Sequence, residues 1–493
     1  MSWIHWGSRA AIAIALAMAV ACGGDDGPGD VTDDPPVDAG GDSAMPIDMG
    51  PPPELEPDTD IGDEGQEVWV FMQSHLHTTG FHSCANNPED PGPPPDGQCY
   101  SAEGITGFLQ LALENGASDM IITDHNNIDA WFDPAFAPLA NIDRTAYATP
   151  LRGIEWSSGD GHMTVFLPRE AVGSNAEALA MDWAHAPGNQ APVGDDFGVY
   201  SNVIDTVHAA GGVVIINHPE LAIHVYPEMS LGADGVEIGI PPNPLDDISG
   251  GAVGFQASAE ARAYWQRRLR SGERLAGTAG ADHHFGGGDI PGLESPTFGI
   301  AVNYIRLDPT LPLPETVADA LTDAETTIDM HSDAVIDALR RGHVMVTESE
   351  AAPRLFVGAD HDGDGRFHDA RAGDCLEAAP GETIRVRVRI TQVSDGPGDH
   401  FNFLAFDHTS DDFIWLEEVS YTDGFPASAN YDVDPDDPYA IELDVTIGDS
   451  GRGFLRFELE RDVLGPVNDT EAVANPIYFG EWGTECAGSA PLF

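Results

Sequence analysis

Residues 68–78 read VWVFMQSHLHT, an apolar run followed by two histidines that stand two positions apart. A short and almost continuous apolar run is typical of a β-strand that is buried on both faces. Because side chains alternate along a strand, His75 and His77 should point to the same side and can hold one ion together. The stretch therefore predicts a buried strand with a metal-binding end.

Further along the chain, short apolar runs alternate with segments of helical periodicity. We expect strands at residues 120–123, 151–156, 163–167, 213–217, 235–240 and 275–279, and helices at residues 105–115, 203–210, 259–270 and 333–341. This alternation is typical of a parallel sheet or barrel that helices cover on both faces. From about residue 352 apolar residues recur at every second position, most clearly over 383–390, which predicts an antiparallel β-sandwich.

Clusters of His, Asp and Glu stand where these strands end or begin. They are HLHT (75–78), ITDHN (122–126), GIEWS (153–157), GHM (161–163), NHP (217–219) and GADHH (280–284). Catalytic groups collect at the carboxyl ends of the parallel strands of a barrel. Imidazole and carboxylate ligands suit zinc, iron or manganese, and a carboxylate such as Glu155 can bridge two ions about 3.5–4 Å apart. The clusters predict one polynuclear metal site.

This series of clusters resembles the polymerase-and-histidinol-phosphatase (PHP) superfamily of metal-dependent hydrolases over residues 67–348. The sequence NPIY at 475–478 and the run at 334–347 are similar to the CehA/McbA branch, which includes secreted or anchored hydrolases with a C-terminal β domain. The resemblance implies a distorted (β/α)7 TIM-like barrel followed by a C-terminal antiparallel β-sandwich at 349–493. It also implies two or three divalent metal ions, which would be Zn, Mn or Fe.

The resemblance assigns the metal ligands position by position. They are His75, His77, Glu155 and Asp282 for the first metal, Glu155, His162 and His218 for the second, and His125 and His284 for a third. Glu155, Asp282 and His218 are the expected centre of catalysis. His284 is preferred to His283 because the family spaces its last motif as Asp-x-His.

Several further positions are candidates for the site. An insertion at 86–98 alters the spacing after His77, so that either His82 or Asp96 is expected to complete the third metal site, and Gln73 stands where the family has Asp. Asp124 is expected to be a ligand or to orient one, a frequent role beside metal-bound histidines. His185 and His224 fall in predicted loops and are candidate contacts for substrate.

The charge of the chain excludes several functions. Its 493 residues hold 83 acidic and 21 basic residues, for a net charge of −62, and every basic residue is Arg. Without Lys, Schiff-base chemistry and a Walker-type phosphate site are excluded. The acidic excess argues against a nucleic-acid partner, because binding a polyanion depends on Lys and Arg. We expect no obligate protein partner.

The N-terminus has the pattern of an export signal. Arg9 precedes an apolar run over 10–21, which is too short to span a bilayer, and small residues flank Cys22. We expect residues 1–21 to be a lipoprotein signal and Cys22 the lipidated residue, an ordinarily cleaved secreted protein being the alternative. Residues 22–66, rich in Asp, Pro and Gly, are expected to be a disordered tether. The predicted location is the bacterial cell envelope, anchored by lipid alone and facing the periplasm or the exterior.

The other four cysteines suit disulfides in an exported protein. Three pairings are possible, and we favour the local one, Cys84 with Cys99 and Cys375 with Cys486. Residues 360–365, DHDGDG, imitate the start of a calcium-binding EF-hand loop. Position twelve of that loop is Arg371 rather than Glu, so an acidic β-turn is the preferred interpretation.

These features predict a hydrolase of small esters, either phosphoesters or carboxyl and carbamate esters. A hydroxide bridging the metal ions would attack the ester, because paired ions lower the pKa of a shared water. The alternative is a non-catalytic surface lipoprotein that binds a glycan or another envelope component and has a structural metal site.

Overall fold

The computed structural model describes the chain in a series of ranges. They are residues 68–77, 109–110, 112–124, 148–158, 161–168, 198–219, 226, 231–239, 253–280, 283–284, 300–308, 324–349, 352–391, 400–420, 422–448, 451–461, 469–480 and 482. The helices with defined bounds in these ranges are α4 (Gly198–Ala209), α6 (Val253–Arg270) and α8 (Ala324–Arg341). No helix in these ranges is long and apolar enough to cross a membrane.

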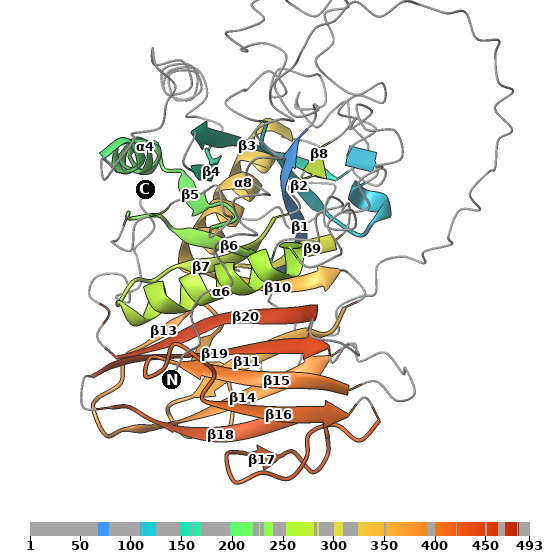
Figure 1. Cartoon of the computed structure of the whole chain (residues 1–493), viewed down its shortest axis with the longest axis vertical. Coiled ribbons are helices and arrows are strands. Elements are labelled where there is room, and N and C mark those ends of the chain that lie inside the picture. Colours follow the sequence, from blue (N-terminus) through green and yellow to red (C-terminus); the bar gives the residue numbers. More distant parts are fainter. Residues whose placement is uncertain are drawn as a thin grey trace, which may run out of the picture.

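One mixed sheet of 15 strands runs through most of the described chain (Figure 1). Its strands are β1 (Val68–His77), β2 (Asp119–Ile122), β3 (Thr149–Ser158), β4 (Gly161–Phe166), β5 (Val213–Ile216), β6 (Gly235–Gly239), β7 (Ala276–Ala279), β8 (His283–His284), β9 (Ile300–Leu307), β10 (Val344–Ser349), β13 (Cys375–Leu376), β15 (His400–Asp407), β16 (Trp415–Ser420), β19 (Arg452–Arg461) and β20 (Asp469–Gly480). Their order is β16-β15-β19-β20-β10-β9-β1-β2-β3-β4-β5-β6-β7, with β13 beside β20 and β8 beside β1.

The predicted distorted (β/α)7 barrel is wrong. The described chain is mostly β-strand with few helices, and antiparallel pairs such as β1–β9, β3–β4 and β4–β5 interrupt the parallel ones. One physical reason lies in the link between β3 and β4, which is only residues 159–160. A parallel pair needs a crossover of a dozen or more residues, whereas a link this short permits only an antiparallel hairpin.

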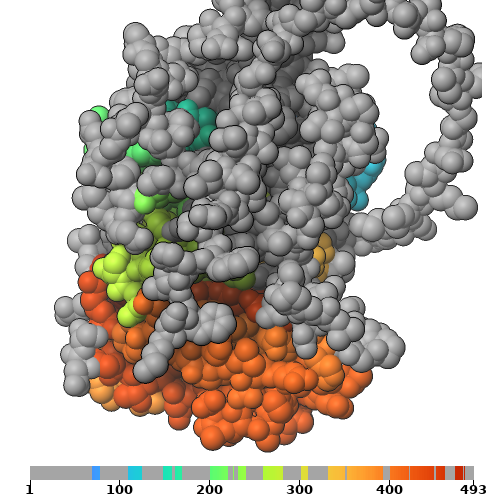
Figure 2. Space-filling model, in the orientation of Figure 1, coloured from blue at the N-terminus to red at the C-terminus, as the bar shows by residue number. Residues whose placement is uncertain are grey.

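The prediction of a separate C-terminal β-sandwich is corrected as well. The C-terminal strands β15, β16, β19 and β20 belong to the large sheet, because β20 pairs with β10. A second, antiparallel sheet holds β11 (Arg354–Asp360), β12 (Ala370–Arg371), β14 (Thr383–Thr391), β17 (Asp432–Val433) and β18 (Ala440–Thr446). Val388 of β14 and Phe403 of β15 share one hydrophobic cluster, so the two sheets pack together. These C-terminal residues, drawn in orange, form the lower part of the face in Figure 2.

The N-terminal part of the large sheet packs around helix α8, which contacts β5, β7 and β9. Val335 and Leu339 of α8 are buried in one cluster with Ile215 of β5 and Ile305 of β9. The apolar residues of α8 therefore meet strands that lie far apart in the order of the sheet. Burial of a large aliphatic side chain contributes about 1.5–3 kcal/mol, so this contact is a main source of stability for the N-terminal part.

Two buried asparagines connect the last strand, β7, to the strands that face it. Asn303 of β9 accepts a hydrogen bond from the Ala279 N–H (2.8 Å) and donates one to the Ala279 carbonyl (3.0 Å). Asn475 of β20 accepts from the Gly277 N–H (2.6 Å) and donates to the carbonyls of Gly277 (2.8 Å) and Val344 (2.6 Å). As the last strand in the order, β7 has no neighbouring strand on one side among the described residues. The two side-chain amides form hydrogen bonds with its backbone that a neighbouring strand would otherwise form.

We predict that Asn475→Ala destabilises the protein by roughly 2–4 kcal/mol, because it leaves buried N–H and carbonyl groups of Gly277 and Val344 without these partners. Urea unfolding, followed by circular dichroism, measures the loss. Asn430→Ala, at an exposed position, is the matched control and should change stability little. Equal unfolding midpoints for the two variants would contradict this role of Asn475.

A partly buried charge cluster connects Asp374 with Arg306 of β9 and with His343, just before β10. Asp374 accepts hydrogen bonds from Arg306 (2.9 Å) and from the Arg371 N–H (2.9 Å), and its Oδ1 is 2.7 Å from His343 Nε2. Burial opposes ionisation of Asp374, but Arg306 and His343 outweigh it and hold the pKa of Asp374 well below its usual 3.8. Burial, with a contribution from Arg306, lowers the pKa of His343 from its usual 6.5.

Both shifts make the protein less stable in acid. A carboxylate with a depressed pKa contributes stability above its unfolded pKa, which is lost as the pH falls below about 3.8. A histidine with a depressed pKa is held neutral, so its contribution declines as the pH falls below about 6.5. We predict that Asp374→Asn lowers the free energy of unfolding by roughly 1.5–3 kcal/mol at pH 7 and by clearly less at pH 3. Urea titrations at both pH values test this, with exposed Asp423→Asn as control.

Candidate metal centre

The candidate site is built around one fully buried carboxylate, Glu155 of β3. Its Oε1 lies 2.9 Å from His162 Nδ1, 3.0 Å from His75 Nε2 and 3.3 Å from His218 Nε2. Its Oε2 lies 3.3 Å from His77 Nε2. The four histidines come from β1, β4 and the residues just after β5, so the sheet brings together side chains that are far apart in the sequence.

The backbone is distorted at two of the four histidines. His75 has φ 57° and His218 has φ 26°, both in a region that residues other than glycine seldom adopt. The pairing of β1 with β2 shifts register between Gln73 and Leu76, around His75. Such irregularities near functional sites redirect side chains, and each strained residue costs about 1–3 kcal/mol. The surrounding fold must hold both histidines in place.

Asn217 and Tyr226 support this arrangement. The Asn217 amide donates to Glu155 Oε1 (2.9 Å), and its oxygen accepts from the Thr164 N–H (2.9 Å). The Tyr226 hydroxyl accepts from the His162 N–H (2.6 Å), donates to the His162 carbonyl and lies 3.3 Å from the Asn217 carbonyl. Burial, and then the neighbouring Tyr200, raises the pKa of Tyr226, so that its hydroxyl stays protonated and can donate.

A second buried carboxylate, Glu237 of β6, lies behind the histidines. Its Oε1 is 2.7 Å from His75 Nδ1, and its Oε2 accepts a 2.7 Å hydrogen bond from the His218 N–H. Glu237, Asn217 and Tyr226 were not predicted from the sequence. A signal for Glu237 was present, because it is an acid inside the buried apolar strand GVEIG, where a charge needs a compensating partner.

The structure brings together five of the predicted ligands, and they are His75, His77, Glu155, His162 and His218. Asp124 is buried beside them, and its backbone carbonyl accepts from the Glu155 N–H (3.3 Å). The backbone of His283 and His284 pairs with Leu76 and His77. The remaining predicted positions lie outside the described residues, and they are His82, Asp96, His125, His185, His224, Asp282, Cys22, Cys84, Cys99 and Cys486. Cys375 is disulfide-bonded, and every other cysteine lies outside those residues.

Two groups of side chains in the described residues could hold a metal ion. In the first, one donor atom each from His75, Glu155 and His218 lie within 4.8 Å of one another, and all three residues are buried. The second comprises Asp360, Asp362 and Asp364. In that loop the Asp360 carboxylate accepts from the N–H groups of Gly363 (2.7 Å) and Gly365 (3.0 Å), as expected for the acidic turn predicted there.

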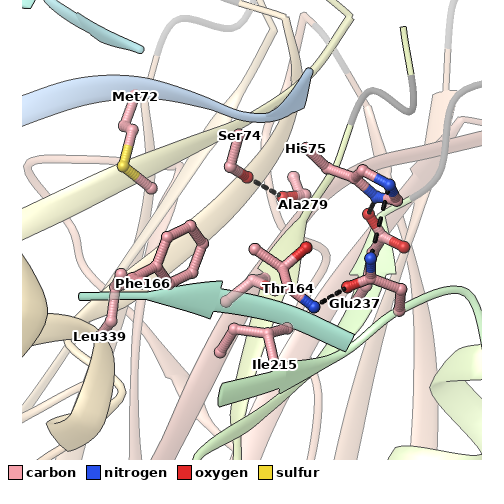
Figure 3. A pocket seen from close by; sticks show the side chains of 11 residues that line it. Met72, Ser74, His75, Thr164, Phe166, Ile215, Glu237, Ala279 and Leu339 are labelled. Carbon is pink, nitrogen blue, oxygen red and sulfur yellow. Dashed lines mark hydrogen bonds and ion pairs between the residues drawn. The ribbon is translucent and has the colours of Figure 1, made fainter. Parts of the chain in front are cut away.

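A small cavity of about 10 Å³ is lined by His75, one member of the first group (Figure 3). Ser74, Thr164 and Glu237 line it together with apolar residues of the sheet and Leu339 of α8. This volume suits about one water molecule and is too small for a substrate. The side chain of His162 is 22% exposed, whereas those of His75, His77, Glu155 and His218 are at most 4% exposed. Among these five residues, His162 is therefore the one that solvent reaches.

Comparison with protein-family models and with curated proteins found no match to this chain. The chemistry of the site is therefore argued from its geometry. Buried imidazole nitrogens around a carboxylate are a donor set that zinc, iron and manganese accept. The residues present fit a divalent transition metal.

We predict that the purified protein binds Zn²⁺ and that Glu155→Gln weakens this affinity by at least about 100-fold. The reason is that Glu155 offers a ligand oxygen and contacts the other donor groups, and even residues outside a ligand set change metal affinity about 10- to 100-fold. Competition with a chromophoric chelator measures the affinity. Glu114→Gln, on an exposed helical turn, is the control and should bind as the wild type does. Unchanged binding by the Glu155 variant would remove Glu155 from the metal centre.

Proposed function

We propose that this protein is a metal-dependent hydrolase of small esters, which are phosphoesters or carboxyl and carbamate esters. The observation that carries the proposal is the convergence of four histidines on the buried Glu155 carboxylate. The resemblance of the sequence motifs to PHP hydrolases supports the same activity.

His75, Glu155 and His218 would hold one ion. His77 faces Oε2 of Glu155 while the other histidines face Oε1, so the carboxylate offers both oxygens and is suited to bridge a second ion. Zn, Mn or Fe would supply a lowered pKa for a bound water and stabilisation of negative charge on the ester oxygen. Two or three ions are proposed, since further candidate ligands lie outside the described residues.

The residues of the chain have distinct tasks in this proposal. Glu155 keeps the donor atoms together, and Asn217 orients its carboxylate through Oε1. His162 is the partly exposed member of the group, so a small ester would reach the site at this residue. The net charge of −62 repels long polyanions, so small esters are favoured over nucleic acid.

The proposed location is the bacterial cell envelope, with a lipid on Cys22 and a tether over residues 22–66. These residues lie outside the described part of the chain. There the hydrolase would meet esters in the periplasm or outside the cell.

We predict a loss of more than about 100-fold in kcat/KM for Glu155→Ala, because its carboxylate joins the donor groups of the site. Turnover of p-nitrophenyl phosphate and p-nitrophenyl acetate by the metal-loaded protein measures the loss, and circular dichroism confirms the fold. Removal of metal by a chelator should abolish activity, and Zn²⁺ or Mn²⁺ should restore it. Glu114→Ala is the control.

Near-normal turnover by folded Glu155→Ala would exclude this mechanism. Tight zinc binding without turnover of any phosphate, carboxyl or carbamate ester would favour the alternative, a surface lipoprotein with a structural metal that binds a glycan or another envelope component.

A further inference from the structure

Glu237 contacts two of the histidines at the centre of the site but lies on the far side of their metal-facing atoms. One carboxylate oxygen is 2.7 Å from His75 Nδ1, while His75 Nε2 is the atom that faces Glu155. The other oxygen accepts from the backbone N–H of His218, the residue with φ 26°. The side chain of Glu237 is 2% exposed, so both contacts are shielded from solvent. The carboxylate of Glu237 therefore fixes both the imidazole ring of His75 and the strained backbone of His218.

The sequence leaves room for this carboxylate at Gly280. A Cβ at position 280 would collide with Glu237 Oε1, and it would lie 2.6 Å from Glu237 Cδ and 3.0 Å from His75 Cβ. No side chain larger than hydrogen fits while Glu237 keeps its place. Gly280 directly precedes the segment that includes the predicted ligand Asp282, so the constraint lies within the same motif.

We propose that Glu237 is a positioning residue for the metal centre, which selects the tautomer of His75 and holds the backbone of His218. The inference rests on the proposed metal centre but not on the hydrolysis of esters. Because Glu237 accepts a hydrogen bond from the Nδ1–H, the imidazole of His75 keeps its proton on Nδ1 and its lone pair on Nε2, beside Glu155. A hydrogen-bonded carboxylate in this position also raises the basicity of a ligating histidine.

Glu237→Gln should disturb this positioning role without removing the bulk of the side chain. The His218 N–H can only donate, so it favours the amide oxygen of Gln and turns the amide NH₂ toward His75 Nδ1. His75 would then accept at Nδ1 and place its proton on Nε2, the wrong tautomer for a ligand. In the opposite amide orientation, the NH₂ group faces the His218 N–H, and two donors oppose each other. The first orientation keeps both hydrogen bonds but imposes the wrong tautomer on His75, and the second loses the hydrogen bond from the His218 N–H.

Glu237→Ala should differ from Glu237→Gln in both its stability and its metal affinity. It leaves a cavity and an unpaired His218 N–H, so it should destabilise the fold more than Gln does. However, it presents no opposing donor to His75, which remains free to choose its tautomer. Glu237→Ala should therefore be the less stable of the two variants, and Glu237→Gln should be the weaker binder of metal.

The experiment measures Zn²⁺ affinity by competition with a chromophoric chelator, and thermal unfolding of the metal-free protein, for the full chain. Glu237→Gln should bind Zn²⁺ about 10- to 100-fold more weakly than the wild type, with a small change in Tm. Glu237→Ala should lose more Tm than Glu237→Gln but no more affinity. Gly280→Ala should also weaken Zn²⁺ binding, whereas Gly448→Ala, where the closest neighbour of an added Cβ is 3.9 Å away, should not.

Wild-type affinity in Glu237→Gln would overturn the proposal, and so would losses of affinity that simply follow the losses of Tm. Failure of the proposed function gives a different result: the wild type binds Zn²⁺, Glu237→Gln binds it weakly, and no ester is hydrolysed. A wild type that binds no Zn²⁺ would overturn the metal centre and this role of Glu237 together.

Discussion

The arrangement of the N-terminal part depends on the hydrogen bonds made by the backbone N–H and carbonyl groups of β7. This strand ends the order of the large sheet, and the amides of Asn303 and Asn475 occupy the backbone groups of Gly277 and Ala279. Buried N–H and carbonyl groups without partners are strongly unfavourable, so these contacts hold β7 against β9, β10 and β20. The same placement brings Gly280 next to His75, and with it the space that Glu237 occupies.

The site contains several features that are energetically unfavourable for the folded chain. Glu155 and Glu237 are buried carboxylates, and two histidines adopt strained backbone angles. Such features persist only where the surrounding structure determines them, and they are concentrated at functional sites. The supporting contacts are also densely shared: Asn217 joins Glu155 to the backbone of β4, and Tyr226 joins His162 to Asn217. Shared contacts of this kind preorganise the site, which would favour the binding of an ion.

Much of the local structure was predictable, and the pairing of strands was not. The apolar runs at 120–123 and 213–217 became β2 and β5, and the alternating run at 383–390 became β14. Periodicity reports burial of a segment but not the direction of its neighbour, so the parallel barrel was a wrong inference. The strands predicted at 151–156 and 163–167 leave only six residues between them, too few for a parallel crossover, and this local signal for a hairpin outweighs the analogy with a barrel. The five converging residues could be predicted because each stands in a compact polar motif. Asn217 was not predicted as a site residue, because its neighbour His218 was taken as the functional residue of the motif NHP. Tyr226 was not predicted, because its role arises only from contacts in the folded structure.

The hairpin of β3 and β4 has a consequence for the way the molecule assembles. Glu155 and His162 are neighbours through a short loop, whereas His75 and His218 must arrive from distant parts of the chain. Contacts that close short loops form at a small entropic penalty and early, and those between distant strands form late. Two of the five residues of the cluster, Glu155 and His162, should thus come together early in a partly folded chain, before the strands that carry the others join them.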